Sequence, residues 1–445
     1  MISEQEILRR RDMRDIFTFT IDPADAKDFD DALSFAVVEE DDNHQSSISN
    51  QQYQIGVHIA DVSHYVKPGT KIDDEAYRRG TSTYLVDRVI PMLPEELCND
   101  LCSLRPGEDK LCMSVIFTMD ADARVHKYKI CRTVIRSDAR LNYDEVQDVI
   151  KTGADTGQVL VNTCVHPLGG APLEQVILTL HALASKLRAE RLANGALAIE
   201  QDEVRFRLDE HYHPTDIYFE HPNEAHHLIE EFMLLANKTV AKAVGSGRPF
   251  VYRVHDLPDN EKLDELKKFK KRLGSRIPQQ TIDLLTIRAQ AKAVYSTYNI
   301  GHYGLAFTHY THFTSPIRRY PDLMVHRLVE KYILTGKPCS LTREELEEKC
   351  EHCSACEQEA AQAERDSIKQ FQTMWMADHL GETFVGHITG IMDFGFFVQL
   401  DDNRCEGLIR MELIEHPEDF VLGDSVTVQV IRVDVNRSQI DFEMV

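Results

Sequence analysis

The chain has 445 residues, enough for two or three domains with a large core. Its hydrophobic content of 42% and its 10 scattered cysteines predict a globular protein of a reducing compartment, the cytoplasm. No apolar run reaches the roughly 20 residues of a membrane-spanning helix, and the N-terminus carries no secretory signal. With 73 acidic and 50 basic residues, the net charge of -23 disfavours non-specific coating of nucleic acid, but it does not exclude a locally basic channel.

Residues 1–15 are rich in arginine and predict a short, solvated helix or linker. The segment after it, residues 16–38, places a dense acidic cluster between two flanks rich in β-branched and aromatic residues, which are typical of strands. The connection between these two expected strands carries five carboxylates: Asp22, Asp25, Asp28, Asp30 and Asp31.

Carboxylates packed this closely have raised pKa values and cost stability unless a cation neutralises them. Mg²⁺ fits such a cluster because it takes oxygen ligands from one or two carboxylates and from substrate phosphate. A solvated acidic loop is an open alternative. An EF-hand calcium loop is excluded, because counting from Asp22 puts Lys27 where glycine is needed and Leu33 where glutamate is needed.

A further apolar strand is expected over residues 55–60, and it leads into His58, Asp61 and His64. These side chains could ligate a metal ion, but we favour hydrogen bonds that order the floor beneath the acids.

Tyr84 lies in a segment that also contains Arg78, Arg79 and Arg88. An exposed tyrosine among arginines can stack on a nucleic-acid base while the arginines hold phosphates. A tyrosine packed in the core fits the same pattern equally well.

Helical periodicity predicts helices over residues 172–193, 225–244, 260–274 and 343–377, and Asn142 is expected to cap a short helix that starts at Tyr143. Glu230 and Glu231 lie beside the apolar face of the second helix, where an acid turned inward would be a functional candidate. The basic helix over residues 260–274 is a solvated face by default, with phosphate binding as the alternative.

The stretch SPIRRYP predicts a loop that turns into a helix at Ser315, with Pro316 at the first helical position. Free helix N–H groups together with Arg318 and Arg319 would form an anion site. Facing the acidic cluster, such a site would suit phosphoryl transfer.

Three cysteines, Cys350, Cys353 and Cys356, recur at a spacing of three within the last predicted helix. Zinc sites need a fourth ligand and usually a turn, so ordinary thiols on a helix are the favoured interpretation.

Residues 381–445 change character, with short alternating strands and turn signals that predict a small barrel. Phe394 and Phe396 stand on or beside one of these strands and could stack on single-stranded bases, although core packing explains some of the phenylalanines there.

Six stretches together resemble the catalytic RNB domain of the ribonuclease II and ribonuclease R family: TIDPADAKDFDDA, GVHIADVSHYV, RGTSTYLVDRVIPMLP, LCSLRPGEDKL, LIEEFMLLAN and HFTSPIRRYPDLMVHRL. The resemblance is closest to the ribonuclease R branch. It implies an α+β fold in which a mixed sheet surrounded by helices encloses an RNA channel, and a small OB-fold barrel follows. The expected domains are a linker over 1–15, the catalytic domain over 16–375 and the barrel over 380–445.

The resemblance implies processive, Mg²⁺-dependent hydrolysis of single-stranded RNA from its 3′ end, releasing nucleoside 5′-monophosphates, with two metal ions that Mn²⁺ could replace. It implies a monomer without a small-molecule cofactor. By position in the family motifs, the metal site would consist of Asp22, Asp28, Asp30 and Asp31. Asp28, Asp30 and Arg318 would be catalytic, and the RNA contacts would be Tyr84, Tyr143, Glu230, Arg319, Phe394 and Phe396.

Two departures from the family pattern bear on RNA binding. The family's second stacking aromatic is expected near Ile199, where this chain has no ring, and the N-terminal cold-shock-type domains usual in the family are not recognised. An RNA-binding protein of the same fold with weak or no catalysis is the first rival function, although all four aspartates are present. A metal-dependent phosphatase acting on small substrates is the second rival, and it leaves the terminal barrel unexplained.

Overall fold

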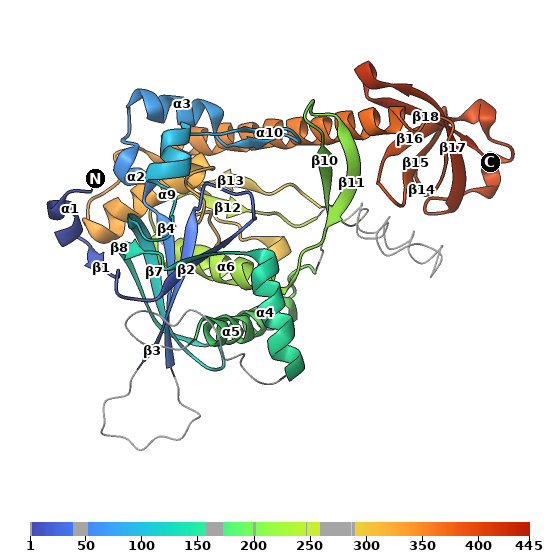
Figure 1. Ribbon diagram of the computed structural model, residues 1–445. Coiled ribbons are helices and arrows are strands. Elements are labelled where there is room, and N and C mark those ends of the chain that lie inside the picture. The colour runs from blue at the N-terminus through green and yellow to red at the C-terminus, as the bar shows by residue number, and fades with distance from the viewer. Residues whose placement is uncertain are drawn as a thin grey trace.

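The computed structural model describes residues 2–38, 52–156, 172–198, 202–245, 247–258, 286 and 290–445. An α+β body and a C-terminal barrel are connected by helix α10 (Arg343–Ala377), which runs along the body and ends beside the barrel (Figure 1). The predicted fold class is confirmed. None of the helices in these ranges is long and apolar enough to cross a membrane.

A mixed sheet of seven strands organises the described part of the body, in the order β1-β8-β7-β4-β3-β2-β9. Its strands are β1 (Arg11–Asp12), β2 (Thr18–Asp22), β3 (Asp31–Val38), β4 (Gln52–Ala60), β7 (Asp109–Asp120), β8 (Val125–Arg136) and β9 (Ala139–Asn142). β2 and β3 form an antiparallel pair, whereas β2 and β9 run parallel with Asp22 opposite Asn142. All five residues of β2 are buried, which explains why its sequence is almost continuously apolar or β-branched.

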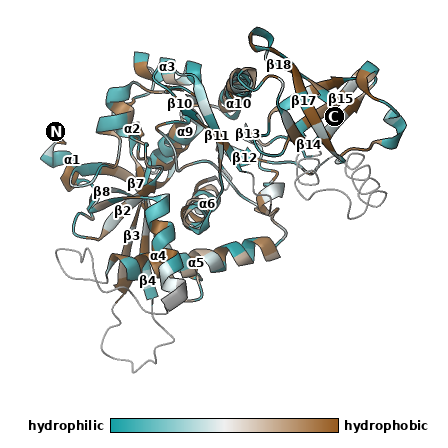
Figure 2. Cartoon of the chain, turned by 45° about the vertical axis from the view of Figure 1, so that its right-hand side comes forward, coloured by the Kyte–Doolittle hydropathy of each residue, from teal (hydrophilic) through white to brown (hydrophobic). Residues whose placement is uncertain are grey.

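Helices pack around this sheet. They are α1 (Glu4–Leu8), α2 (Val62–Tyr65), α3 (Lys71–Arg79), α4 (Tyr143–Thr156), α5 (Leu173–Ala193), α6 (Glu224–Gly245) and α9 (Tyr320–Val329). The predicted boundaries of α5, α6 and α10 are confirmed to within one residue. Brown and teal alternate along α5 in Figure 2, as its three- and four-residue periodicity predicts. The predicted helix over 260–274 lies outside the described residues.

The expected short, solvated helix is present as α1, which has no buried residue, but the residues that follow it belong to the body rather than to a linker. β1 pairs in parallel with β8, and Arg10 is buried beneath the sheet edge. Arg10 Nη2 donates to Asp61 Oδ2 at 2.7 Å, and both side chains are fully buried. Arg132 Nε lies 3.2 Å from the same oxygen, so two arginines share one carboxylate. The N-terminal segment thus supplies Arg10 as a partner for the Asp61 carboxylate, because a buried charge without a partner would be very unfavourable.

His58 is a structural residue, as favoured from the sequence. Its Nδ1 lies 2.7 Å from Ser114 Oγ and its Nε2 lies 2.8 Å from Ser34 Oγ, so both ring nitrogens are satisfied inside the sheet. Burial lowers its pKa to about 3, which keeps the imidazole neutral. His58 therefore crosslinks three neighbouring strands, β3, β4 and β7.

Two-stranded sheets extend from the body. They are β5 (Thr83–Tyr84) with β6 (Val89–Ile90), β10 (Glu203–Leu208) with β11 (Pro214–Glu220), and β12 (Tyr252–Val254) with β13 (Val294–Ser296). The β10–β11 hairpin lies beside α10 between the body and the barrel (Figure 1), and Ile217 of β11 packs into the barrel core.

The predicted C-terminal barrel is confirmed as a closed five-stranded barrel in the order β14-β15-β16-β18-β17. Its strands are β14 (Thr383–Met392), β15 (Gly395–Leu400), β16 (Glu406–Arg410), β17 (Ser425–Asp434) and β18 (Gln439–Met444). Arg404 joins the barrel to the segment before β10 by an ion pair with Asp202, and its guanidinium lies 4.6 Å from the Phe219 ring centroid. The barrel is therefore anchored to the body by more than α10.

The cysteines of α10 are packing residues, as favoured from the sequence. Cys350 and Cys353 are buried in the body's core, and Cys356 is half-buried against Gly80. His352, between them, donates through Nε2 to the Tyr77 carbonyl at 2.8 Å.

We expect Asp61→Ala to destabilise the chain by about 3–5 kcal/mol, because two arginines lose their shared carboxylate inside the protein. Burial raises the pKa of Asp61, but Arg10 and Arg132 outweigh it and hold the pKa at about 2, below the ordinary 3.8. The stabilisation is therefore complete above about pH 4 and is lost as the pH falls toward 2. Urea unfolding followed by circular dichroism measures both effects. The matched control is Asp15→Ala at an exposed position. Equal stability of the two variants at pH 7 would contradict this account.

Candidate active site

The acidic segment connects two adjacent strands of the sheet. Asp22 is the last residue of β2 and Asp31 is the first of β3, while Asp28 and Asp30 lie on the connection between them. Asp22 and Asp30 are buried, whereas Asp25 is exposed. The strand ends thus fix the position of the acids, as the flanking patterns predict, and the interpretation as a solvated loop is wrong for Asp22 and Asp30.

Hydrogen bonds from Ser103 hold the connection in place. Ser103 Oγ donates to the Lys27 carbonyl at 2.7 Å and accepts from the Phe29 amide at 3.1 Å. The Leu104 amide donates to the Phe29 carbonyl at 3.0 Å, and the Ala60 amide donates to the Asp30 carbonyl at 2.9 Å. These hydrogen bonds fix the loop that carries the acids through its own backbone and do not use the carboxylates.

Arg318 faces this segment from a turn almost three hundred residues further along the chain. Its Nε lies 3.3 Å from Asp30 Oδ2, and the other oxygen of Asp30 accepts from the Ile317 amide at 2.9 Å. Arg318 Nη2 also donates to Ser315 Oγ at 3.1 Å. The arginine side chain is 46% exposed, so its guanidinium is held on one side and open on the other. The structure thus brings the predicted acids and the predicted arginine together.

The clustered carboxyl groups have too little positive charge around them, and their pKa values are raised. Burial raises the pKa of Asp30 to about 7 although Arg318 lowers it. Burial raises the pKa of Asp22 to about 6, opposed by the charge of Arg140. Burial also raises the pKa of Asp28, and it raises that of Asp31 well above the ordinary value with the charges of Asp22 and Asp30 adding to it. The site would therefore gain from added positive charge.

The carboxylate oxygens of the cluster are the type of ligand that a hard cation such as Mg²⁺ prefers. Asp22 Oδ2 is buried without a hydrogen-bond partner, which is unusual for a carboxylate oxygen. In the ranges that the structure describes, no group of three or more His, Cys, Asp or Glu side chains is arranged so that it could hold a metal ion. Mg²⁺ commonly takes only one or two protein carboxylates and completes its shell with water and substrate phosphate.

The SPIRRYP segment differs from its prediction. Helix α9 begins at Tyr320 rather than at Ser315, and residues 316–318 form a turn. The amides expected to be free are occupied, because the Ser315 amide donates to Asp322 Oδ1 at 2.8 Å and the Ile317 amide donates to Asp30. An anion site built on these two amides is therefore excluded.

Arg319 has a different partner from Arg318. Its Nε and Nη2 donate to the two oxygens of Asp322 at 2.9 and 2.8 Å, a bidentate pair whose carboxylate is fully buried. The guanidinium of Arg319 is used to stiffen the turn that carries Arg318. This geometry therefore does not favour the predicted RNA contact at Arg319.

Tyr84 lies beside Arg318 because two loops pair. The Ser82 amide donates to the Arg318 carbonyl, and the Tyr320 amide donates to the Gly80 carbonyl, each at 2.9 Å. Tyr84 is 41% exposed, so the alternative of a fully packed core tyrosine is wrong. Burial of its hydroxyl end raises the pKa of Tyr84 to about 12, against the lowering effect of Arg318.

Tyr143 approaches the acids from the other side. It follows Asn142, which is opposite Asp22 in the sheet, and it begins α4. Asn142 caps that helix as predicted, since its Oδ1 accepts from the Glu145 amide at 2.9 Å. Burial raises the pKa of the Tyr143 phenol, and the charges of Asp31 and Asp22 add to the shift, which indicates that its hydroxyl lies within electrostatic reach of the cluster.

Glu230 and Glu231 face different ways on α6. Glu230 is exposed, and Arg191 Nη2 lies 3.5 Å from its Oε1. Glu231 is the acid that turns inward, but it is paired with the buried Arg191, whose Nη2 donates to Glu231 Oε1 at 2.5 Å. Arg191 thus contacts both glutamates, Glu231 more closely than Glu230. Ile199, where the family's second stacking aromatic is expected and no ring stands, lies outside the described residues.

The two phenylalanines of the barrel have opposite environments. Phe394 lies in the turn between β14 and β15 and is 59% exposed. Phe396 is fully buried in the barrel core, where it packs against Phe420. The prediction that Phe396 stacks on RNA is wrong, because successive residues of a strand point to opposite sides and its side faces the core.

Two residues of this site had no role assigned from the sequence. Arg140 Nη2 donates to the Pro23 and Ala24 carbonyls at 2.9 and 2.6 Å, and its guanidinium lies 5.3 Å from the Phe29 ring centroid. Ser103, described above, is the second. The stretch LCSLRPGEDKL was a signal for Ser103, whereas Arg140 acts on carbonyl groups that no side-chain pattern displays.

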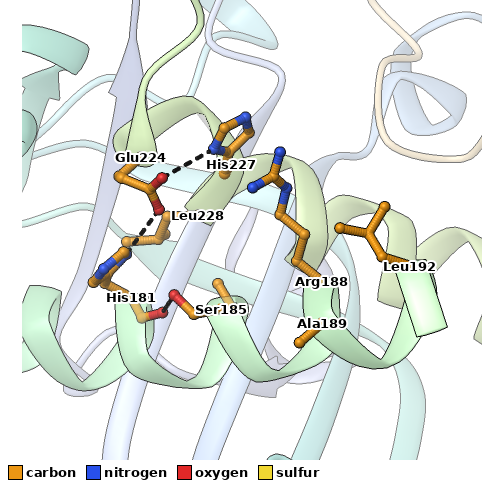
Figure 3. Close-up of a pocket in the computed structure, with 9 residues that line it drawn as sticks. His181, Ser185, Arg188, Ala189, Leu192, Glu224, His227 and Leu228 are labelled. Carbon is orange, nitrogen blue, oxygen red and sulfur yellow. Dashed lines mark hydrogen bonds and ion pairs between the residues drawn. The ribbon is translucent and has the colours of Figure 1, made fainter. Parts of the chain in front are cut away.

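A separate pocket of about 200 Å³ lies between α5 and α6 (Figure 3). The Glu224 carboxylate lies between two of its histidines, with one oxygen 3.8 Å from His181 Nδ1 and the other 3.6 Å from His227 Nδ1. None of the clustered acids lines this pocket.

Comparison with known protein families identifies two domains in the chain. The RNB domain family matches residues 10–335, and the S1 RNA binding domain matches residues 378–444. The chain belongs to the RNB domain family. The acid segment and the Arg318 turn both lie within the matched range, and the second match coincides with the closed barrel.

Ribonuclease R of Aquifex aeolicus is 39% identical over 100% of this chain and 66% of its own length. Ribonuclease R of Escherichia coli is 33% identical over 100% of this chain and 58% of its own length. The chain therefore spans about 58 to 66% of these relatives.

Two solved structures support the fold. Mycoplasma genitalium RNase R in complex with ribose methylated single-stranded RNA superposes with a TM-score of 0.87 at 27% identity, over 100% of this chain and 73% of that one. Yeast Ssd1, a pseudonuclease, superposes with a TM-score of 0.73 at 18% identity, over 97% of this chain and 54% of that one, and this likeness shows the fold alone.

We expect Phe396→Ala to destabilise the barrel by about 3–5 kcal/mol, because it opens a cavity in a closed core. Phe394→Ala should change stability by less than about 0.5 kcal/mol, since its ring is exposed. Trp375 is the single tryptophan and packs against the barrel core, so its fluorescence during urea unfolding reports on the barrel. Similar losses in the two variants would contradict the assigned environments.

Proposed function

We propose that the chain is a 3′-to-5′ exoribonuclease that hydrolyses single-stranded RNA and releases nucleoside 5′-monophosphates in a processive manner. The observation that carries the proposal is the meeting of Asp30 and Arg318, with the buried carboxylates of Asp22, Asp28 and Asp31 beside them, in an RNB domain. The clustered carboxylates can bind a cation, and the guanidinium of Arg318 is open on one side. Together they form a site for a phosphodiester.

Mg²⁺ is the proposed cofactor, with Mn²⁺ as a substitute. Asp22 and Asp31 would hold it directly, and Asp28 and Asp30 would complete the acidic surround. The unpartnered Oδ2 of Asp22 and the all-oxygen donor set support this assignment. When bound, Mg²⁺ supplies positive charge for the scissile phosphate and lowers the pKa of a water molecule.

The chain's own residues bind and orient the substrate. Arg318 has donors left over after Asp30 and Ser315, and these can reach a phosphate oxygen and stabilise charge that develops there. Lysine would not replace it well, because the arginine fork holds the two protein oxygens and the phosphate at once.

Tyr143 and Glu230 would hold the 3′-terminal nucleotide, and Tyr84 would stack on a base near the scissile bond. Farther away, Phe394 on the barrel offers a second exposed ring for single-stranded RNA. Stacking and phosphate contacts carry no base code, so sequence preference should be low, and contacts to the 2′-hydroxyl would favour RNA over DNA. We propose a cytoplasmic enzyme that acts as a monomer in RNA decay and processing.

The rival is an RNA-binding protein of the same fold without hydrolysis. The name of yeast Ssd1, a pseudonuclease, illustrates that the fold does not require catalysis. The retention of all four carboxylates and of the ion pair at Asp30 favours an enzyme over a binder.

We expect a 5′-labelled oligoribonucleotide to be shortened to an end product of a few nucleotides with Mg²⁺, with little accumulation of intermediate lengths, and to remain intact with EDTA. Asp30→Asn should abolish cleavage while RNA binding persists, because the amide keeps the volume but loses the charge that holds Arg318. Asp25→Asn, at the exposed aspartate of the same loop, is the matched control and should cleave as the wild type does. Cleavage by Asp30→Asn at the wild-type rate would remove this site from the reaction, and a band shift without cleavage by the wild type would support the binder.

A further inference from the structure

The ring of Tyr143 is stacked on a histidine from another helix. The Tyr143 and His226 ring centroids are 3.8 Å apart with an interplanar angle of 12°, so the rings lie nearly parallel. In the described part of the chain only one other ring pair, Trp375 with His379, is as close. Most other ring contacts there are tilted or edge-on, the usual arrangements of protein aromatics. His226 covers one face of the Tyr143 ring and fixes its plane, and Tyr143 is only half-buried, so part of its side chain is open to solvent.

Both rings are held by the ends of their helices. His226 Nδ1 lies 2.9 Å from Asn223 Oδ1, and the same Asn223 oxygen accepts from the Ala225 amide at 3.0 Å at the start of α6. Tyr143 begins α4 directly after Asn142, which is capped reciprocally with Glu145. The His226–Tyr143 stack therefore joins the beginnings of α4 and α6 beside the acidic cluster.

We propose that His226 is a positioning residue that fixes the plane of Tyr143, so that the 3′-terminal base stacks on the tyrosine from the side opposite the histidine. This inference rests on the proposed function and deepens it by naming what orients the terminal-nucleotide contact. The histidine acts through Tyr143 and does not need to touch RNA. Its consequence is that His226 determines how short a fragment stays bound long enough for another cut.

The neutral form of the imidazole suits this role. Burial lowers the pKa of His226, with the charge of Glu220 opposing the shift, so the ring is uncharged at neutral pH. An uncharged ring stacks on Tyr143 without adding a cation beside the terminal phosphate.

His227 provides a matched control on the same helix. It is the next residue, its side chain is buried, and it turns toward Glu224 in the pocket of Figure 3. Removing its ring tests the loss of a histidine from α6 without disturbing the stack.

The test compares His226→Ala, His226→Phe, His227→Ala and Tyr143→Ala on a 5′-labelled oligoribonucleotide with Mg²⁺. We expect His226→Ala to lengthen the shortest product, as Tyr143→Ala does, and to raise KM for short oligomers by about 2- to 12-fold. The initial kcat on long RNA should change much less, because the acids and Arg318 are untouched. His226→Phe, which restores a ring, should recover the wild-type product length, and His227→Ala should match the wild type.

An unchanged product length in His226→Ala, when Tyr143→Ala lengthens it, would overturn the inference and leave the proposed function intact. Failure of His226→Phe to rescue would overturn it as well. A wild-type chain that leaves RNA intact would overturn the proposed function and this inference with it. If His226→Ala does not fold, His226→Leu keeps the volume without an aromatic face and is expected to behave as described for alanine.

Discussion

The interaction on which the site depends is the burial of aspartates beside Arg318. Asp22 and Asp30 are almost completely removed from solvent, and burial raises the pKa of each toward neutrality. Arg318 is the cation that contacts the cluster directly, through Asp30. Such an arrangement costs stability in the absence of further positive charge, and proteins retain that cost mainly where the charge is used. The rest of the fold can be understood as the frame that holds these groups at close range.

That frame is assembled from distant parts of the chain. The acids lie at the ends of β2 and β3, and parallel pairing of β2 with β9 brings Tyr143 next to Asp22. Pairing of the segment at residues 80–84 with the turn at residues 318–320 places Tyr84 beside Arg318. The Arg319–Asp322 pair stiffens the same turn. Each contact uses backbone groups or buried ion pairs, so the site is determined by the sheet rather than by flexible side chains, which is how precise sites are usually supported.

Much of this could be predicted from the sequence because its signals are local. Apolar flanks predicted that the acids connect two strands, and the periodicity of α5, α6 and α10 predicted their boundaries closely. Other features depend on contacts that no local pattern displays. Helix α9 starts late because Asp30, from a distant segment, takes the Ile317 amide and Asp322, in the first turn of α9 itself, takes the Ser315 amide. The segment before Ile16 contributes β1 to the sheet, and Arg10, just before β1, forms an ion pair with the buried Asp61. Phe396 is a core residue because the barrel closes around it, which only the register of its strands decides.

The most direct test of the central claim is the thermal unfolding of the RNA-free chain in EDTA and over a titration with Mg²⁺. If the buried aspartates lack positive charge, binding of the ion to the folded state must raise the unfolding midpoint, by about 2.7 kcal/mol of stability at a concentration one hundred times the dissociation constant. The account predicts this rise for the wild type and for Asp25→Asn, and a much smaller rise for Asp22→Asn. A wild-type midpoint that does not respond to Mg²⁺, or an equal response in Asp22→Asn, would contradict it.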